Sequence, residues 1–131
     1  MADRFSILGQ LALANETETV LYTVPVAAAT TVGGTVDVAP KVVSRLTQSL
    51  VSSVIVCNRD AGEATYYVRL KASGETDNDK EYIFFDTAIP GKKTHILALA
   101  LTLSAGDSLE VKAGSGDSNK LSFTAMGIEV T

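Results

Sequence analysis

Residues 50–72, LVSSVIVCNRDAGEATYYVRLKA, contain the pattern on which the predicted fold depends. Residues 51–57 are rich in β-branched side chains, and residues 64–71 alternate between apolar and polar side chains. A period of two is typical of a strand that buries one face and leaves the other in water. Residues 58–62 favour a tight turn, because Asn, Asp and Gly tolerate left-handed backbone or cap their own chain. The stretch therefore predicts a β-hairpin.

Similar strand patterns occur on both sides of this stretch. Strands are expected over residues 5–13, 19–24, 82–85, 94–103, 109–113 and 121–130, with turn-forming residues between them. Leu and Ala in 94–103 favour helix intrinsically, but the strict alternation of large and small side chains favours a strand. About seven to nine strands without a convincing helix predict an all-β fold, an antiparallel β-sandwich that is jelly-roll-like.

The chain of 131 residues is expected to form one domain, 1–131. N-terminal strands lie in 1–25, and the sandwich core occupies 49–131. Between them, 26–48 is expected to be a long loop or arm, because small uncharged residues without clear periodicity surround Gly33 and Gly34. A short β-ribbon around 31–38 is one expectation for this arm. It is interpreted either as a partner-binding segment or as a flexible surface loop.

Charge and sorting signals limit the partners that the sequence predicts. The net charge of −4 repels polyanions, so no nucleic-acid partner is expected. The apolar run 5–14 is short and interrupted by Gly9 and Gln10, which argues against a signal peptide. No stretch approaches the ~18 consecutive apolar residues of a membrane span, so no membrane partner is expected. The single cysteine, Cys57, is predicted to be a buried structural thiol without a disulfide partner.

Motifs for catalysis, cofactors and metals are weak or missing. His95 is the only histidine, and its pairing with Cys57 as a nucleophile and base has no support in the sequence. The acidic run 77–81 lacks the spacing of a calcium loop, and 114–120, GSGDSNK, lacks that of a phosphate loop. The prediction is a protein without enzyme activity, with no catalytic residue, no cofactor and no metal site. A carboxylate pair for glycoside hydrolysis stays open among Glu63, Asp77, Asp79, Glu81 and Asp86.

Five motifs carry a resemblance to a known class of proteins: ILGQLA at 7–12, VCNRD at 56–60, IPGKKT at 89–94, LTLSAGDSLEV at 101–111 and GIEVT at 127–131. Together the similar regions cover about 5–22 and 51–131. They resemble small head and tail accessory proteins of double-stranded DNA bacteriophages, especially phages of cyanobacteria and other aquatic bacteria. The motifs are mostly turn sequences. The LTLSAGDSLEV motif is interpreted as a hairpin.

The resemblance implies a viral structural protein without enzymatic function. A capsid cement or decoration subunit that stabilises the phage head is favoured, and a tail or baseplate component is the alternative. Its implied partners are copies of itself, with a homotrimer favoured, and the major capsid protein or a tail protein. The implied location is the virion, on the capsid surface rather than the tail, after synthesis in the host cytoplasm.

A binding module is the hypothesis from another class. A receptor- or carbohydrate-binding sandwich would use Tyr66, Tyr67, Tyr82 and the loop acids. Sugar platforms need exposed aromatic faces, and a chain with 6% aromatic residues and no Trp argues against one.

Some expected strands are apolar on both faces, which suggests that a neighbouring subunit covers one of them. Ile83 and Phe85 alternate with Tyr82 and Phe84, and the leucines of 97–103 alternate with Ile96, Ala98 and Ala100. The residues expected to contact partners are Phe5, Ile7, Leu8, Val32, Val36, Val38, Tyr67 and Phe85.

Overall fold

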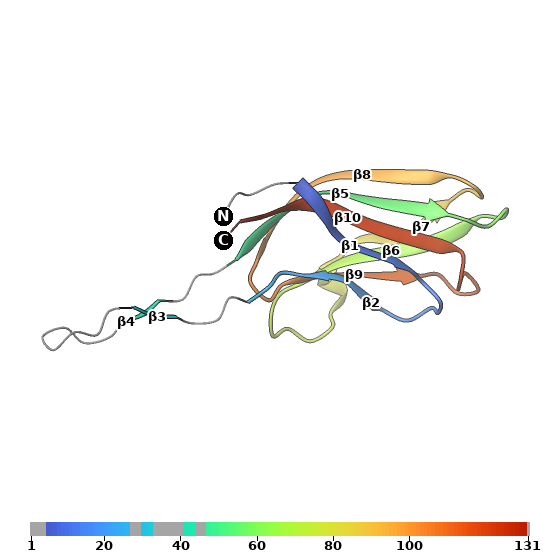
Figure 1. The fold of residues 1–131 in the computed structure, drawn as a ribbon. Coiled ribbons are helices and arrows are strands. Elements are labelled where there is room, and N and C mark those ends of the chain that lie inside the picture. The colour runs from blue at the N-terminus through green and yellow to red at the C-terminus, as the bar shows by residue number, and fades with distance from the viewer. Residues whose placement is uncertain (1–4, 27–29, 33–40, 44–46, 131) are drawn as a thin grey trace, which may run out of the picture.

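Two four-stranded antiparallel sheets pack against each other in the computed structural model of the chain (Figure 1). The structure describes residues 5–26, 30–32, 41–43 and 47–130. Within these residues nearly every regular element is a strand, and one short 3₁₀ turn, η1 (Asp79–Glu81), is the exception. This confirms the all-β sandwich that the alternation predicts.

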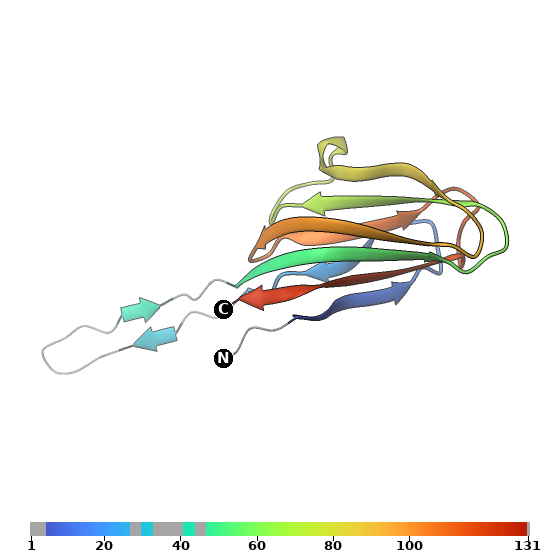
Figure 2. The ribbon, with the colours of Figure 1, turned by 90° about the horizontal axis from the view of Figure 1, so that it is seen from above.

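Sheet A contains, in spatial order, β1 (Phe5–Ala12), β10 (Leu121–Val130), β5 (Gln48–Asn58) and β8 (Thr94–Ser104). Sheet B contains β2 (Thr19–Thr23), β9 (Ser108–Ala113), β6 (Ala64–Lys71) and β7 (Tyr82–Ile89). Two short strands, β3 (Thr30–Val32) and β4 (Lys41–Val43), pair with each other in a third sheet. Both views place this pair beyond one end of the sandwich (Figures 1 and 2).

The hairpin predicted for residues 50–72 is wrong. Its first run is β5, which pairs with β10 and β8 in sheet A, whereas its second run is β6, which pairs with β9 and β7 in sheet B. The two strands therefore face each other across the core instead of lying side by side. The hairpin interpretation of LTLSAGDSLEV is wrong for the same reason, because β8 belongs to sheet A and β9 to sheet B.

The crossing between β5 and β6 is held by a buried asparagine. The Nδ2 group of Asn58 donates hydrogen bonds to the carbonyl oxygens of Gly62, Ile89 and Pro90, at 2.9, 3.1 and 3.2 Å. Gly91 packs so closely on the backbone of Ala61 that a Cβ atom would collide with its carbonyl oxygen. The VCNRD and IPGKKT turns thus pack on each other and direct the chain from one sheet to the other.

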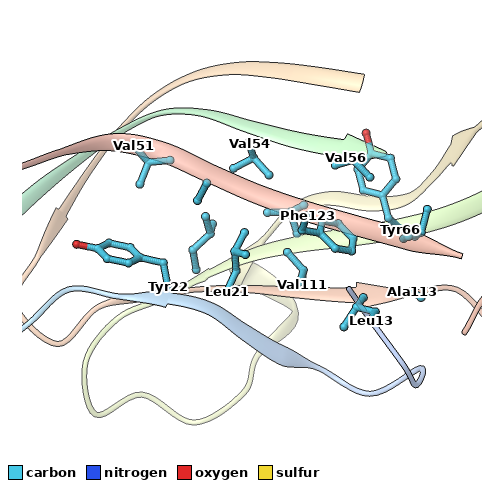
Figure 3. Close-up of a cluster of buried hydrophobic side chains, with 14 of the residues drawn as sticks. Leu13, Leu21, Tyr22, Val51, Val54, Val56, Tyr66, Val111, Ala113 and Phe123 are labelled. Atoms are coloured by element: carbon cyan, nitrogen blue, oxygen red, sulfur yellow. The ribbon is translucent and has the colours of Figure 1, made fainter. Parts of the chain in front are cut away.

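The core lies between the sheets, where the inner faces of both contribute side chains (Figure 3). Figure 3 shows Val51, Val54 and Val56 of β5 on one side and Leu21 and Val111 of sheet B on the other. Tyr66 of β6 and Phe123 of β10 are fully buried, and their rings meet edge to face with centroids 6.3 Å apart. Burial of these apolar faces is the main stabilising contribution to the sandwich.

Candidate interaction surfaces

The outer face of sheet A is a regular array of uncharged side chains, which we call the neutral face. Strand register aligns sixteen of its residues in four rows, each running from β1 through β10 and β5 to β8. The rows are Phe5–Ile128–Leu50–Thr102, Ile7–Met126–Ser53–Ala98, Gln10–Thr124–Ile55–Ile96 and Ala12–Ser122–Cys57–Thr94. Large apolar side chains in this array face water: Phe5 is 64% exposed, Ile7 58% and Ile96 70%.

Charge is concentrated away from sheet A. Its four strands contain one Asp, Glu, Lys or Arg residue, Glu129, and this residue belongs to the inward-facing set. Glu129 Oε1 accepts a hydrogen bond of 2.8 Å from the Tyr22 hydroxyl, which also lies 2.6 Å from Ser49 Oγ. Burial, together with the Glu129 carboxylate, raises the pKa of Tyr22 to about 12. The only ionisable carboxylate of these strands is therefore used inside the fold, and none lies on the neutral face.

Sheet B has a buried arginine on its outer face. Arg69 of β6 is covered by the segment that follows β6 and by Glu18, and is 3% exposed. Four carboxylates surround its guanidinium: Glu110 at 2.8 Å, Asp77 at 2.6 Å, Glu18 at 3.5 Å and Glu81 at 3.8 Å. Burial lowers the pKa of Arg69, but the carboxylates, Glu110 first, raise the pKa by more than burial lowers it. The guanidinium therefore stays charged.

Local structure explains how these carboxylates converge. In η1, Asn78 and Glu81 form a capping box, with the Asn78 N–H donating to Glu81 Oε1 at 2.9 Å. The Lys71 ammonium lies 2.8 Å from Asp77 and lowers the pKa of that carboxyl. The segment between β6 and β7 is thus tied down over Arg69 by ion pairs and a helical cap.

An aromatic cluster adjoins the ion pairs on sheet B. It consists of Tyr67, Tyr82 and Phe85, and the Phe85 ring meets the two tyrosine rings edge to face at 4.9 and 5.1 Å. The Lys112 ammonium lies 4.3 Å from the centre of the Tyr67 ring. Phe85 is 65% exposed, whereas the Tyr82 hydroxyl donates to Glu18 at 2.8 Å. Burial, and then Glu18, raise the pKa of Tyr82 to about 12.

Cys57 and His95 lie on opposite faces of sheet A. Cys57 pairs with Thr94 on the neutral face, whereas His95 pairs with the buried Val56 on the inner face. His95 Nδ1 is 3.0 Å from the Tyr66 hydroxyl. The two side chains therefore do not form a nucleophile and base pair. Cys57 is a free cysteine that is partly exposed, so the prediction that it is buried is wrong.

Two observations concern metals and membranes. In the part of the chain that the structure describes, no group of three or more His, Cys, Asp or Glu side chains could hold a metal ion. Within the same residues, no helix has the length and apolar character needed to cross a bilayer.

The residues predicted to contact partners separate into three groups. Phe5 and Ile7 lie exposed on the neutral face, and Tyr67 and Phe85 lie in the aromatic cluster of the other sheet. Leu8 instead packs against the core, because it follows the outward-facing Ile7 in the alternation of β1. Val36, Val38 and the side chain of Val32 are outside the described residues.

Comparison with known proteins adds no assignment to these surfaces. No family model, curated protein or solved structure matches the chain significantly.

Proposed function

We propose that the chain is a structural subunit of a bacteriophage virion, without enzymatic activity, that decorates and stabilises the head. The neutral face is the observation that carries this proposal. Four strands present an exposed apolar and small-polar surface without a single charge, although 20% of the chain is charged. Exposed apolar surfaces of this extent are typical of protein contact sites.

The aromatic cluster supports a contact with a second kind of partner. Aromatic side chains are enriched at protein interfaces and supply large contact areas. Phe85 is the most exposed of the cluster and is held in place by edge-to-face contacts with Tyr67 and Tyr82. In this proposal the neutral face joins copies of the chain, three of them if the phage resemblance holds. The aromatic cluster meets the major capsid protein or a tail protein.

Immunogold electron microscopy of particles from cells that carry the gene tests the location. Antibodies against the recombinant chain are expected to label the heads of intact virions. Label confined to tails would select the tail or baseplate alternative. Particles without label, together with the absence of the chain from their mass spectra, would contradict a virion role.

The variant Phe85→Ala distinguishes attachment to the capsid from carbohydrate binding. We expect this variant to bind empty capsids at least tenfold more weakly while its fold is unchanged. The control is Ile83→Ala, which removes an apolar side chain at a neighbouring position of β7. A carbohydrate-binding module would instead bind host cell-wall polysaccharide through Tyr67 and Tyr82. If the wild-type chain bound polysaccharide but no capsids, the structural proposal would be overturned.

A further inference from the structure

We infer that the neutral face is covered by other copies of this chain, with the β1 side of one copy packed on the β8 side of the next in the same rows. The inference rests on the proposed role as an assembly subunit and names the partner of one surface. The symmetry axis that relates the copies runs parallel to the strands of sheet A. Each row of one copy therefore lies opposite the same row of the next copy.

Charge argues that the occupant is this chain itself. Each copy carries a net charge of −4, so two copies repel each other at most orientations. Of the outer faces of sheets A and B, only the neutral face allows two copies to approach without bringing like charges of the described residues together. The outer face of sheet B, by contrast, holds Arg69, Glu110 and Lys112.

Side-chain size argues for the direction of packing. In two rows the large residue lies on β1 and the small one on β8: Phe5 with Thr102, and Ile7 with Ala98. The third row does not show this difference, because both Gln10 on β1 and the exposed Ile96 on β8 are large. An axis parallel to the strands places β1 of one copy against β8 of the next at equal height. Phe5 then meets Thr102, and Ile7 meets Ala98, so protrusions face small side chains.

The area of the face is sufficient for a specific contact. Four strands at ~4.8 Å give a width of ~19 Å, and eight residues at ~3.4 Å give a length of ~27 Å. Two copies would therefore cover on the order of 1,000 Å² before the relief of the side chains is counted, which is the lower bound for specific interfaces.

The same width also suits three copies around one axis. Three faces of ~19 Å arranged as a triangular prism lie ~5.5 Å from the axis, close to half of the ~10 Å spacing of stacked sheets. Side chains from all three copies then fill the centre. Pairs and triplets share the contact of β1 with β8, which is the contact that the experiment addresses.

Paired cysteines test this contact directly. In a Cys57→Ser background, the double variant Ile7→Cys with Ala98→Cys is expected to be crosslinked between chains by a bismaleimide that spans ~10 Å, because facing sheets lie too far apart for a direct disulfide. On a denaturing gel, the largest crosslinked species should contain two or three chains, because a contact with closed symmetry cannot join further copies. Either single cysteine variant should stay uncrosslinked, as should the mismatched pair Ile7→Cys with Thr94→Cys. Crosslinking by Ile7→Cys alone, or none by the matched pair, would overturn the inference.

A charge placed on the face gives an independent measurement. Ala98→Lys is expected to reduce the mass in solution to that of one chain, 13.7 kDa, with an unchanged circular dichroism spectrum. The matched control is Ala88→Lys on β7 of sheet B, an exposed alanine that should leave the assembly intact. A wild-type chain that is monomeric, or an assembly that Ala98→Lys leaves intact, refutes the self-contact. A monomer found on phage heads would refute this inference alone, whereas an assembled chain absent from particles would refute only the proposed function.

Discussion

The two sheets of the sandwich use the same alternation of side chains but differ in what their outer faces do. Sheet B places Arg69 outward and then covers it with Glu18, Glu81, Asp77 and Glu110, so its polar groups satisfy one another within the chain. Sheet A places outward only uncharged side chains, among them the exposed Phe5, Ile7 and Ile96, and nothing in the described chain covers them. The covered ionic face has its charges paired within the chain, whereas the uncovered apolar face is available to a partner.

The largest expected effect comes from removing the buried cation of sheet B. Arg69→Met keeps much of the side-chain volume but leaves Glu110 and Glu81 buried without their partner. Breaking a buried ion pair in this way costs about 3–5 kcal/mol of the free energy of unfolding. Urea denaturation at fixed protein concentration measures it, and Lys80→Met, on an exposed lysine, is the control.

A second substitution sharpens this result. Adding Glu110→Gln to Arg69→Met removes one of the uncompensated charges and should recover part of the lost stability. A loss below about 1 kcal/mol for Arg69→Met, within the range of exposed ion pairs, would mean that sheet B gains no more from its charges than an ordinary surface does.

Tyrosine titration compares the pKa of Tyr22, which lies between the sheets, with that of Tyr82, which lies on the outer face of sheet B. The folded pKa values of Tyr22 and Tyr82, about 12, lie above the ordinary value of about 10. The fold therefore favours the protonated form. Its contribution to stability is complete below pH ~10 and is lost as the pH rises toward ~12.

Ultraviolet absorbance of tyrosinate checks this expectation. At least two of the four tyrosines should ionise near pH 12 in the folded chain, and all four near pH 10 in urea. Tyr82→Phe should remove one of the late protons. Four tyrosines that ionise together near pH 10 in the folded protein would show that neither phenol is held as the structure places it.

The smallest expected effect concerns the cation beside the aromatic cluster. Lys112→Met removes the ammonium group near the Tyr67 ring and should cost about 0.5–1 kcal/mol. Lys93→Met, on an exposed lysine in the turn before β8, removes the same charge and should change the free energy of unfolding by less. Equal effects of the two substitutions would show that net charge, and not the aromatic contact, is responsible.

The strands could be predicted from the sequence, but not which strands pair. The alternation in 64–71 and 94–103 shows which side chains are buried, and the structure confirms strands there. Alternation does not distinguish a hairpin from a crossing between sheets, because both bury the same side chains. What decides the crossing is the contact of Asn58 with Ile89 and Pro90, about thirty residues away along the chain.

The candidate surfaces were predictable to different degrees. Exposed apolar residues such as Phe5 and Phe85 follow from strands that are apolar on both faces. The carboxylates around Arg69 come from three separate segments, and no local spacing indicates that they converge. A signal for the neutral face is present in the sequence, since the strands of sheet A hold only Glu129 as a charged residue, but it becomes clear only when strand order is known.

The pairing of β1 with β10 has a consequence for how the protein is made. Phe5 pairs with Ile128, so one edge of sheet A cannot close until β10 has left the ribosome. Most other pairings also join distant segments, which makes folding slow because long loops must close first. During this interval the apolar strands of sheet A are unprotected. Newly synthesised chains are therefore expected to depend on chaperones and to aggregate when expressed rapidly.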